Sequence, residues 1–573
     1  MATTQNRNNF KMRTRVILGA VLFVAILLVI RLYFLQIVHG SKYRIEASDQ
    51  YVSTSAGFYD RGDIFFVGKN NLQVRGATIK TGFLLAIKPI DIVDAEQVYS
   101  VLEPYLKIDK ETFMMRATKD DDPYEEVASR LNESSAAAIR AENLDGVLLL
   151  PDRWRYYPSG SLAAHILGFV AYDGAELNGR YGLERYFDDV LARGSASLYI
   201  NFFAELFTNI RDIVFVPVNK REGDIITTLE PEVQVQLERV LARMKEKWNS
   251  QFTAGIVIDP QTGAVRALAV NPTFDLNNFG NAETADFANP LIERVYEMGS
   301  IMKPLTLAAG LDSGAVTPES TYNDSGSIDL DTYTISNFDG RARGIVKMQE
   351  ILSQSLNTGV AYIVNKMGKD EFRRYMYRYG VNEETGIDLP NEANNLTENL
   401  NSPRDVEYAT ASFGQGIALT PITMVRALSI LPDGYIEQPY IVSAIQPTSG
   451  LRHNIDYSDT REQILDPETT EEITRMLVKV FDEALLGGDL KNERYSIAAK
   501  TGTAQIPSPD GGYYDDRYLH SFFGYFPAFD AKYLVFLMNV EPQGAQYASQ
   551  TLAEPFMEMT NFLINYYDIP PDR

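Results

Sequence analysis

The sequence predicts an α+β protein of several domains, in which one sheet flanked by helices follows a single N-terminal membrane helix. Three observations predict this class. The chain of 573 residues is too long for one domain. An apolar run near its N-terminus is long enough to cross a bilayer. In the C-terminal half, strand-like segments at both ends enclose helical segments, which is expected when distant parts of a chain close one sheet.

The N-terminal residues 1–15 predict a cytoplasmic tail, because they contain four basic residues and no acidic one. Residues 16–38 form the apolar run, and Arg31 is the one charge inside it. Basic flanks stay in the cytoplasm, so the large acidic remainder is expected outside the cytoplasmic (inner) membrane. The alternative is a cleaved signal peptide, but the apolar segment continues past Arg31 without a small-residue cleavage site.

The composition argues against several functions. A net charge of −23 argues against a nucleic-acid partner, because such binders need a basic face. The chain has no cysteine, so disulfides, cysteine-ligated zinc and cysteine nucleophiles are excluded. The 4 histidines stand singly, so we expect no metal and no other cofactor. Without a G-x-S-x-G motif, a Ser-His-Asp hydrolase is disfavoured too.

The rest of the chain divides near residue 222. Residues 39–221 contain no nucleophile motif, and their patterns predict helices around 95–106 and 124–141. Residues 222–573 are expected to form a second domain, and the patterns that predict its elements are apolar positions and turn residues. The expected elements are a short strand 227–230, a helix 232–248, a hairpin 254–258 and 264–270, a buried strand 533–540, and surface loops 382–403 and 507–517.

The first motif is Ser300-Ile301-Met302-Lys303. Pro304 fits only the first turn of a helix, so the helix starts near Ser300. The N–H of Ser300 then has no intrahelical partner and can face an oxyanion. Lys303 shares the face of Ser300, and burial beside a second cation would lower its pKa and make its amine a base. The plainer alternative is a surface Ser and Lys on a helix.

The second motif is Ser355-Leu356-Asn357, between helical patterns at 347–352 and 360–367. At such a junction, short polar side chains can point into a cleft. Ser355 would relay a proton towards the leaving group, and Asn357 would hold the substrate amide and the amine of Lys303. The alternative is helix capping, which Ser and Asn do routinely.

The third motif is Lys500-Thr501-Gly502-Thr503, expected where an apolar strand ends. Gly502 would let a substrate backbone approach closely, whereas Thr501, Thr503 and the charge of Lys500 suit a terminal carboxylate. The N–H of Thr503 would complete an oxyanion hole. Alone, this motif is also compatible with a plain strand-to-turn exit. In this order along one chain, the three motifs predict a serine acyl-transferase with a lysine base.

These motifs resemble those of the active-site serine penicillin-recognising family, and specifically of class B penicillin-binding proteins. Other resembling stretches are Arg61-Gly62, Tyr157–Gly168, Gly182–Glu184, Ser412–Gly416 and Ala553–Phe556. The resemblance implies a penicillin-binding/β-lactamase-like transpeptidase fold, an antiparallel sheet flanked by helices, for residues 222–573. It implies an elongated, non-catalytic pedestal of the dimerisation type for residues 39–221.

The resemblance also implies the reaction. A peptidoglycan D,D-transpeptidase acylates Ser300 with a D-Ala-D-Ala stem peptide and passes the acyl group to a neighbouring stem, and β-lactams acylate the same serine. The implied partners are stem peptides, lipid-linked precursor strands, a polytopic glycosyltransferase of the SEDS type and other cell-wall machinery. The segment Ser412–Pro421 resembles the division (septal) branch more than the elongation branch.

Two alternatives stay open. One is a D,D-carboxypeptidase or β-lactamase of the same superfamily, although a class A β-lactamase often has S-D-N at the second motif. The other is a non-catalytic scaffold or penicillin sensor that keeps the pocket. Release of bound penicillin within minutes would favour the first alternative. Intact motifs do not prove turnover, so the sequence leaves the second alternative open.

Overall fold

The computed structural model describes residues 60–106, 108–119, 124–174, 176–193, 222–448, 451–509 and 511–573. The expected tail and membrane span, residues 1–38, lie outside these residues. In the part of the chain that is described, no helix is long and apolar enough to cross a membrane. The chain forms two compact units, one holding Gly82–Arg153 and the other holding Asp60–Thr81 with Trp154–Arg573.

The smaller unit is a layer of strands and helices around its own apolar core. Its strands are the end of β2 (Gln73–Ile87), β3 (Glu125–Leu131) and most of β4 (Val147–Tyr156). Its helices are α3 (Ala95–Leu102), α4 (Lys110–Ala117) and α5 (Glu133–Ala141). Leu85, Leu102 and Phe113 are fully buried in this core, which therefore joins a strand to two helices.

The expected helix 124–141 is wrong in its first half, which is strand β3. The side chain of Asn132 accepts a hydrogen bond from the N–H of Ser135, so the helix begins only after Asn132. Before it, Val127 and Leu131 are buried and their neighbours are more exposed, as in a strand with one covered face. The expected helix 95–106 is α3 followed by a 3-10 turn, Glu103–Tyr105, that contains a proline.

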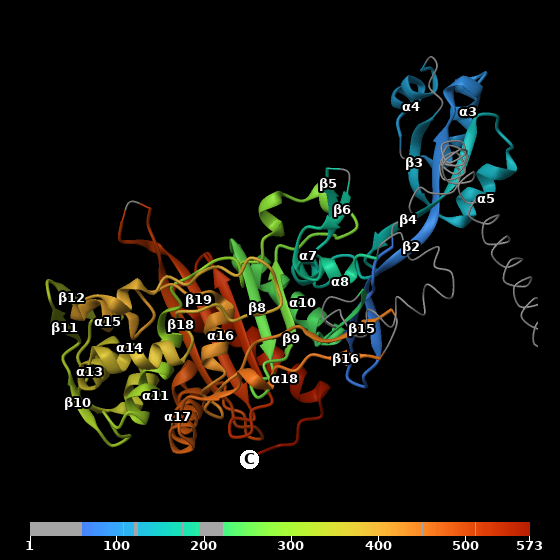
Figure 1. Cartoon of the computed structure of the whole chain (residues 1–573). Helices are drawn as coiled ribbons and strands as arrows, with labels where there is room; N and C mark the ends of the chain where they lie inside the picture. The colour runs from blue at the N-terminus through green and yellow to red at the C-terminus, as the bar shows by residue number, and fades with distance from the viewer. Residues whose placement is uncertain are drawn as a thin grey trace, which may run out of the picture. The chain divides into compact units, whose positions relative to one another are not determined.

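The larger unit is built on a five-stranded antiparallel sheet of order β18-β19-β20-β8-β9 (Figure 1). The strands are β8 (Phe252–Ile258), β9 (Val265–Asn271), β18 (Ala498–Pro507), β19 (Tyr513–Phe526) and β20 (Tyr533–Val540). The expected hairpin and the expected buried strand 533–540 are confirmed. Every residue of β8 is buried, as in a strand covered on both faces.

Helices cover both faces of this sheet, as two positions of β19 that are three residues apart demonstrate. Phe522 stacks on Phe556 of α18 (Ala548–Tyr566) with ring centroids 4.4 Å apart. The hydroxyl of Tyr525 lies 2.8 Å from that of Thr474 in α17 (Pro467–Lys479). Alternate strand residues point to opposite faces, so α18 and α17 lie on opposite sides. Helix α10 (Pro231–Trp248) packs with α18, and α11 (Lys303–Asp312) packs with α17.

A second sheet joins residues 60–81 to the segment that begins at residue 222. Strand β1 (Ile64–Val67) pairs in parallel with β7 (Gly223–Thr227), and Ile64 lies opposite Ile225. Strand β15 (Val442–Pro447) pairs with the other edge of β7. The expected strand 227–230 is therefore shifted towards the N-terminus, because the residues after Thr227 lead into α10, whose first residue is Pro231.

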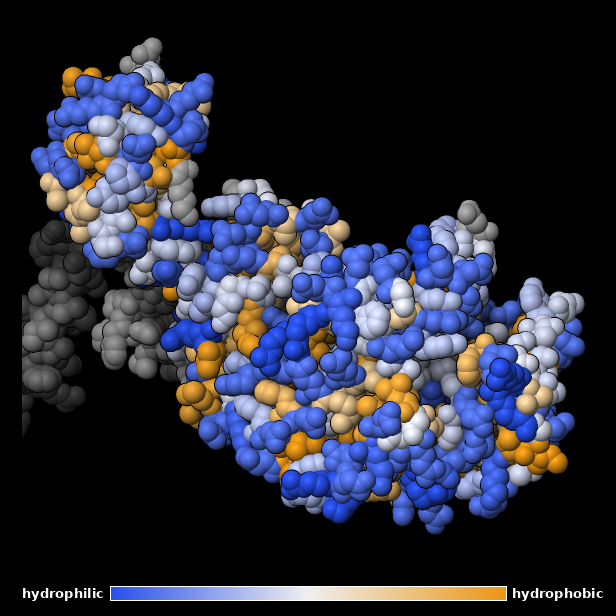
Figure 2. All heavy atoms as spheres, turned by 180° about the vertical axis from the view of Figure 1, so that it is seen from behind, coloured by the Kyte–Doolittle hydropathy of each residue, from blue (hydrophilic) through white to orange (hydrophobic). Residues whose placement is uncertain are grey.

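Helices and two pairs of short antiparallel strands complete this unit. The helices are α12 (Met348–Ser353), α13 (Asn357–Met367), α14 (Lys369–Arg378), α15 (Asp405–Ala411) and α16 (Pro421–Leu428). The strands are β10 (Thr321–Asp324), β11 (Ser327–Leu330), β12 (Tyr333–Ser336) and β13 (Gly344–Lys347). Of these elements, α13, α14, α15, β10, β11 and β12 lie at the left of Figure 1. The face shown in Figure 2 is mostly hydrophilic with small hydrophobic groups between, in keeping with the high net charge.

The expected loop 507–517 is mostly wrong. Strand β18 runs to Pro507 and β19 begins at Tyr513, so only a short turn separates them. Thr503 pairs with His520 and Gln505 pairs with Tyr518, so the third motif does not end its strand as expected but lies inside it. The loop expected at 382–403 is confirmed, because its one regular piece is the 3-10 turn Glu398–Asn401.

Candidate active site

Ser300 lies in a 3-10 turn, Gly299–Met302, that leads directly into α11. The turn is held by close backbone contact with a second segment: the N–H of Gly299 donates to the carbonyl of Gly414 at 3.1 Å. A Cβ on Gly414 would lie 2.4 Å from the carbonyl oxygen of Gly299, so only glycine permits this approach. Among the described residues no backbone partner accepts the N–H of Ser300, which is the free donor that the sequence predicts.

Lys303 is completely buried, and its amine contacts Ser355. Its Nζ donates to the Oγ of Ser355 at 3.0 Å and to the carbonyl oxygen of Ser355 at 2.5 Å. Burial lowers the pKa of Lys303 well below its ordinary value, and the nearby charge of Lys500 lowers the pKa further. Both causes are the expected ones. In the described part of the chain, no hydrogen bond joins the amine of Lys303 to the hydroxyl of Ser300. The amine is hydrogen-bonded to Ser355 instead.

Ser355 occupies the junction between α12 and α13, as expected, with a positive φ of 55°. Asn357 is the first residue of α13. Its side-chain amide donates to the carbonyl of Ser336 at 2.9 Å, and its N–H donates to the Oδ1 of Asn337 at 3.0 Å. Within the described residues Asn357 makes no hydrogen bond to Lys303, which differs from the sequence expectation.

Lys500 is also buried, with 3% of its surface exposed. Its Nζ donates to the carbonyl of Thr501 at 2.9 Å, and burial lowers the pKa of Lys500 to about 8. Gly502 serves the protein's own packing: a Cβ there would lie 2.4 Å from the Oγ of Ser521 and 2.8 Å from the carbonyl of Met298. Because Gly502 has no side chain, its strand can pack closely against the turn that holds Ser300.

One cavity of about 780 Å³ collects most of the predicted residues. Its wall includes Ser300, Ser355, Asn357, Thr501 and Thr503, whereas Lys303, Lys500 and Gly502 lie behind it. The described residues contain no cluster of side chains that could hold a metal ion. The cavity therefore offers a serine hydroxyl, a buried amine of lowered pKa and a buried cation, the groups that acyl transfer through a serine ester requires.

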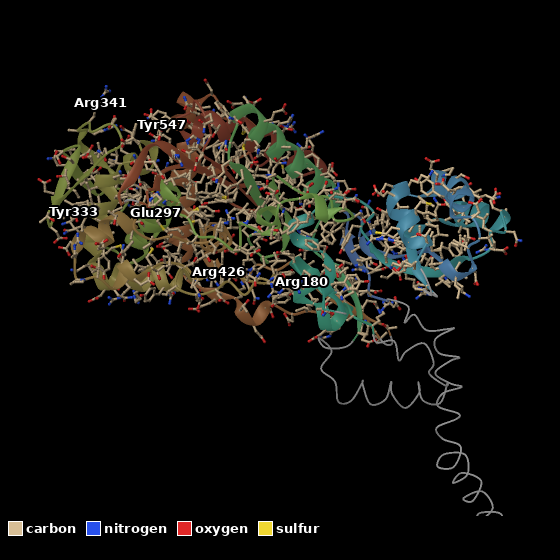
Figure 3. All side chains as sticks on the ribbon, turned by 90° about the horizontal axis from the view of Figure 1, so that it is seen from above. Arg180, Glu297, Tyr333, Arg341, Arg426 and Tyr547 are labelled. Atoms are coloured by element: carbon tan, nitrogen blue, oxygen red, sulfur yellow. The ribbon has the colours of Figure 1, made fainter. Side chains whose placement is uncertain are left out.

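The wall also contains residues that the sequence analysis did not select. Phe338 and Tyr547 lie far apart in the sequence, yet their ring centroids are 6.1 Å apart, and Tyr547 is labelled in Figure 3. Asn337 and Gln415 line the cavity as well. Of these residues, only Gln415 lies in a stretch that the sequence analysis named, Ser412–Gly416, which was selected by its resemblance to the family. No motif contains Phe338, Tyr547 or Asn337.

Residues 253–560 match the family described as "Penicillin binding protein transpeptidase domain", a stretch longer than half of the 573-residue chain. The chain belongs to the penicillin-binding protein transpeptidases. Residues 66–201 match the family described as "Penicillin-binding Protein dimerisation domain". A dimerisation domain ahead of a transpeptidase domain makes this penicillin-binding protein one of class B, as the motifs suggested, with a serine-type transpeptidase domain.

Named relatives agree with this assignment. The chain is 27% identical to Stage V sporulation protein D of Bacillus subtilis, over 96% of this chain and 85% of that protein. It is 26% identical to the probable peptidoglycan D,D-transpeptidase PenA of Neisseria gonorrhoeae, over 78% of this chain and 74% of PenA. Its fold resembles penicillin-binding protein 2X of Streptococcus thermophilus, with a TM-score of 0.71 at 20% identity, covering 90% of this chain and 81% of that one.

A half-buried carboxylate ties the β18–β19 hairpin of this penicillin-binding protein to the segment that precedes Ser300. Glu297, labelled in Figure 3, accepts hydrogen bonds from the hydroxyl of Tyr513 and from the N–H of Gly416, each at 2.9 Å. Burial raises the pKa of Glu297. Tyr513 is the first residue of β19, so this carboxylate holds the tip of the hairpin near the segments that flank Ser300.

Proposed function

We propose that this protein cross-links peptidoglycan as a D,D-transpeptidase, with Ser300 as the nucleophile and Lys303 as its base. The observation that carries the proposal is the completely buried amine of Lys303, which lies behind the wall of the cavity that Ser300 lines and donates to Ser355, a residue of that wall. A neutral amine at this position can take the proton of a serine hydroxyl.

The reaction proceeds through an ester of Ser300. Its oxygen attacks the carbonyl carbon of the penultimate D-Ala of a stem peptide, and the proton of its hydroxyl passes to the amine of Lys303. The N–H groups of Ser300 and Thr503 stabilise the oxyanion. The bond to the terminal D-Ala nitrogen then breaks, and Ser355 relays the proton from Lys303 to that nitrogen. An amine of a second stem peptide then attacks the ester carbonyl and gives a proton to the amine of Lys303; the ester bond breaks, that proton passes to the oxygen of Ser300, and the new amide is the cross-link.

The remaining groups hold the donor peptide. Lys500 supplies the positive charge for the terminal carboxylate, assisted by the hydroxyls of Thr501 and Thr503. The side-chain amide of Asn357, which now donates to Ser336, is free to exchange that bond for one to the substrate amide. β-Lactams carry a carboxylate and a strained amide, so they are expected to acylate Ser300 through the same contacts.

A labelled penicillin tests the nucleophile assignment. We expect one covalent adduct per wild-type chain, mapped to Ser300 by peptide mass spectrometry, and a loss of labelling of at least about 10³-fold in Ser300→Ala. Ser313→Ala, at the C-terminal end of α11 and outside the cavity lining, is the matched control and should label normally. Equal labelling of wild type and Ser300→Ala would refute the assignment.

The fate of the adduct separates the alternatives. Release of the label within minutes favours a β-lactamase or carboxypeptidase, whereas a stable adduct favours a transpeptidase. Transfer of a stem-peptide acyl group to an added D-amino acid or amine demonstrates transpeptidation and excludes a non-catalytic sensor. A protein that labels with penicillin and never transfers an acyl group to an amine would be a scaffold.

For the cellular setting we propose a single-pass protein of the cytoplasmic membrane, anchored by residues 16–38, with the catalytic unit outside. The basic tail ahead of this apolar run supports that orientation. We also propose a septal role beside a polytopic SEDS-type glycosyltransferase, because the segment Ser412–Pro421 resembles the division branch. Protease digestion of intact spheroplasts tests the orientation: the catalytic unit should be degraded while an epitope placed before Arg7 survives.

A further inference from the structure

A second cavity, of about 370 Å³, lies beside helix α13 and shares no lining residue with the active-site cavity. Helix α13 contributes Thr358, Ala361, Tyr362 and Asn365 to its wall, which are spaced so that they share one face of the helix. Asn357, the residue immediately before Thr358, lines the active-site cavity. One turn of helix therefore borders both cavities.

The lining of this second cavity is largely aromatic and apolar. The rings of Tyr322 and Tyr362 are stacked with centroids 5.3 Å apart, and aliphatic side chains from β11 and α13 extend this apolar wall. Lys369 and Asp405 are the charged residues of the lining, and they pair at 2.8 Å, so the wall presents no net charge. A cavity of this size with a few polar groups and aromatic walls is typical of small-molecule sites.

A buried chain of hydrogen bonds connects this wall to the active site. The hydroxyl of Tyr322 lies 3.4 Å from that of Thr358, which donates to Asp324 at 2.7 Å. Asp324 also accepts from the side-chain amide of Asn337 at 2.9 Å. The Oδ1 of Asn337 in turn accepts the N–H of Asn357 at 3.0 Å. Three of these side chains, on Asp324, Asn337 and Thr358, are each at most 3% exposed.

We propose that this cavity, lined by Tyr322, Tyr362 and Ala361, binds a neutral, planar aromatic molecule that carries a hydrogen-bonding group. Its occupant contacts Tyr322 and Thr358 and so changes the acylation of Ser300 through Asp324, Asn337 and Asn357. This is a second site with a regulatory effect, and it lies beyond transpeptidation itself. Coupling between two sites requires an element that both sites touch, and the first turn of α13 is that element.

Indole serves as the binding probe for the full chain. We expect saturable binding of indole by ligand-observed NMR, weakened about tenfold or more in Ala361→Trp, which fills the cavity. Ala137→Trp adds the same side chain at an exposed position of α5 and is the matched control, with binding unchanged. If Ala361→Trp fails to fold cooperatively, Tyr362→Leu removes half of the aromatic stack and should weaken binding instead. Absence of saturable binding, or equal binding in these variants, overturns the site.

The coupling is measured separately as the rate of penicillin labelling with and without saturating indole. We expect the rate to change at least about twofold in wild type. Thr358→Val keeps the shape of the wall, so indole should still bind, but most of that change should be lost because the hydroxyl that links Tyr322 to Asp324 is gone. An unchanged wild-type rate overturns the coupling. The same change in Ala361→Trp would also overturn it, since indole would then act at the active-site cavity. Binding is read without acylation, so failure here is distinct from failure of the transpeptidase proposal.

Discussion

Two buried lysines with different contacts dominate the chemistry at the scale of single residues. Burial lowers the pKa of both, but the amine of Lys303 is additionally opposed by the charge of Lys500. Lys303 therefore tends to be the neutral member and Lys500 the charged one. Two titratable groups whose pKa values are separated by their surroundings can divide the roles of base and cation.

This division predicts a bell-shaped pH dependence of the acylation rate. The rate should fall at acid pH, where Lys303 becomes protonated and stops acting as a base. It should fall again above about pH 8, where Lys500 loses the charge that holds a substrate carboxylate. The second-order rate constant of penicillin labelling across pH measures both limbs.

Lys500→Arg provides the control for this profile, because arginine keeps its charge throughout. The alkaline limb should move to higher pH in the variant, even if the longer side chain lowers the maximum rate. An alkaline limb that stays in place would assign it to a group other than Lys500.

Asp324 is a positioning residue rather than a catalytic one. It is 1% exposed and accepts hydrogen bonds from Thr358, Asn337 and the N–H groups of Gly326 and Arg343. Burial alone would raise the pKa of Asp324, but these donors outweigh it and lower the pKa. The stability that the carboxylate contributes is therefore present above its unfolded pKa and is lost as the pH falls through the folded pKa.

Asp324→Asn should lower the free energy of unfolding by about 1–3 kcal/mol at neutral pH, because the amide places donors against donors. The difference from wild type should shrink in acid, where the wild-type carboxyl is itself protonated. Denaturant titration at two pH values measures this. Asp370→Asn is the control: that side chain is 92% exposed in a surface ion pair, so its loss should change little. A pH-independent deficit would contradict the assignment of the effect to charge.

At the scale of elements, the nucleophile turn depends on a segment more than a hundred residues away. The two segments touch at Gly299 and Gly414, whose backbones are hydrogen-bonded at 3.1 Å. Gly414 has a φ of +77°, which side-chain-bearing residues rarely adopt. The position of Ser300 therefore depends on a loop as well as on its own helix.

Gly414→Ala should disturb this support. The added methyl group would overlap the backbone of Gly299, and the positive φ costs about 1–2 kcal/mol more for alanine. Because small displacements of a nucleophile are costly, we expect penicillin labelling to slow about 10²-fold with the fold retained. Gly340→Ala has a similar φ of +65° with no atom near its Cβ, so it carries the backbone penalty without the overlap. Equal slowing in both variants would attribute the effect to backbone strain alone.

Sequence patterns predicted the elements whose signal is local. Helix α10 follows apolar positions at helical spacing, strand β20 is a nearly continuous apolar run, and Pro304 marks the start of the helix that follows Ser300. The patterns missed the polar parts of β18 and β19, since residues such as Thr503 and Asp515 look like loop residues until the partner strand is known. Asp324 and Asn337 were missed for a related reason: they reach Asn357 through tertiary contacts, and neither lies in a motif.

At the scale of the whole molecule, an ion cluster ties early parts of the chain to the catalytic unit. Glu184 is completely buried and accepts hydrogen bonds from Arg61 and Arg155 at 2.5 and 2.6 Å. The hydroxyl of Tyr157 lies 3.2 Å from the same carboxylate. Arg61 precedes β1, which pairs with β7 at the start of the catalytic segment. The sequence predicts domain boundaries after residues 15, 38 and 221. The ion cluster and β1 lie before the last of these boundaries but belong to the same compact unit as the residues that follow it.

Glu184→Gln should therefore destabilise the catalytic unit although it lies outside the active-site cavity. Two guanidinium groups would be left buried without their shared carboxylate, and breaking a buried ion pair in this way typically costs about 3–5 kcal/mol. We expect a lower denaturant midpoint, measured by tryptophan fluorescence, with the penicillin labelling rate of the folded protein unchanged. Glu554→Gln, whose side chain is 80% exposed beside Lys247, should leave the midpoint within the error of wild type. An unchanged denaturant midpoint in Glu184→Gln would mean that hydrogen bonding alone satisfies both arginines. If labelling slowed while the midpoint stayed unchanged, the cluster would affect the cavity and not stability.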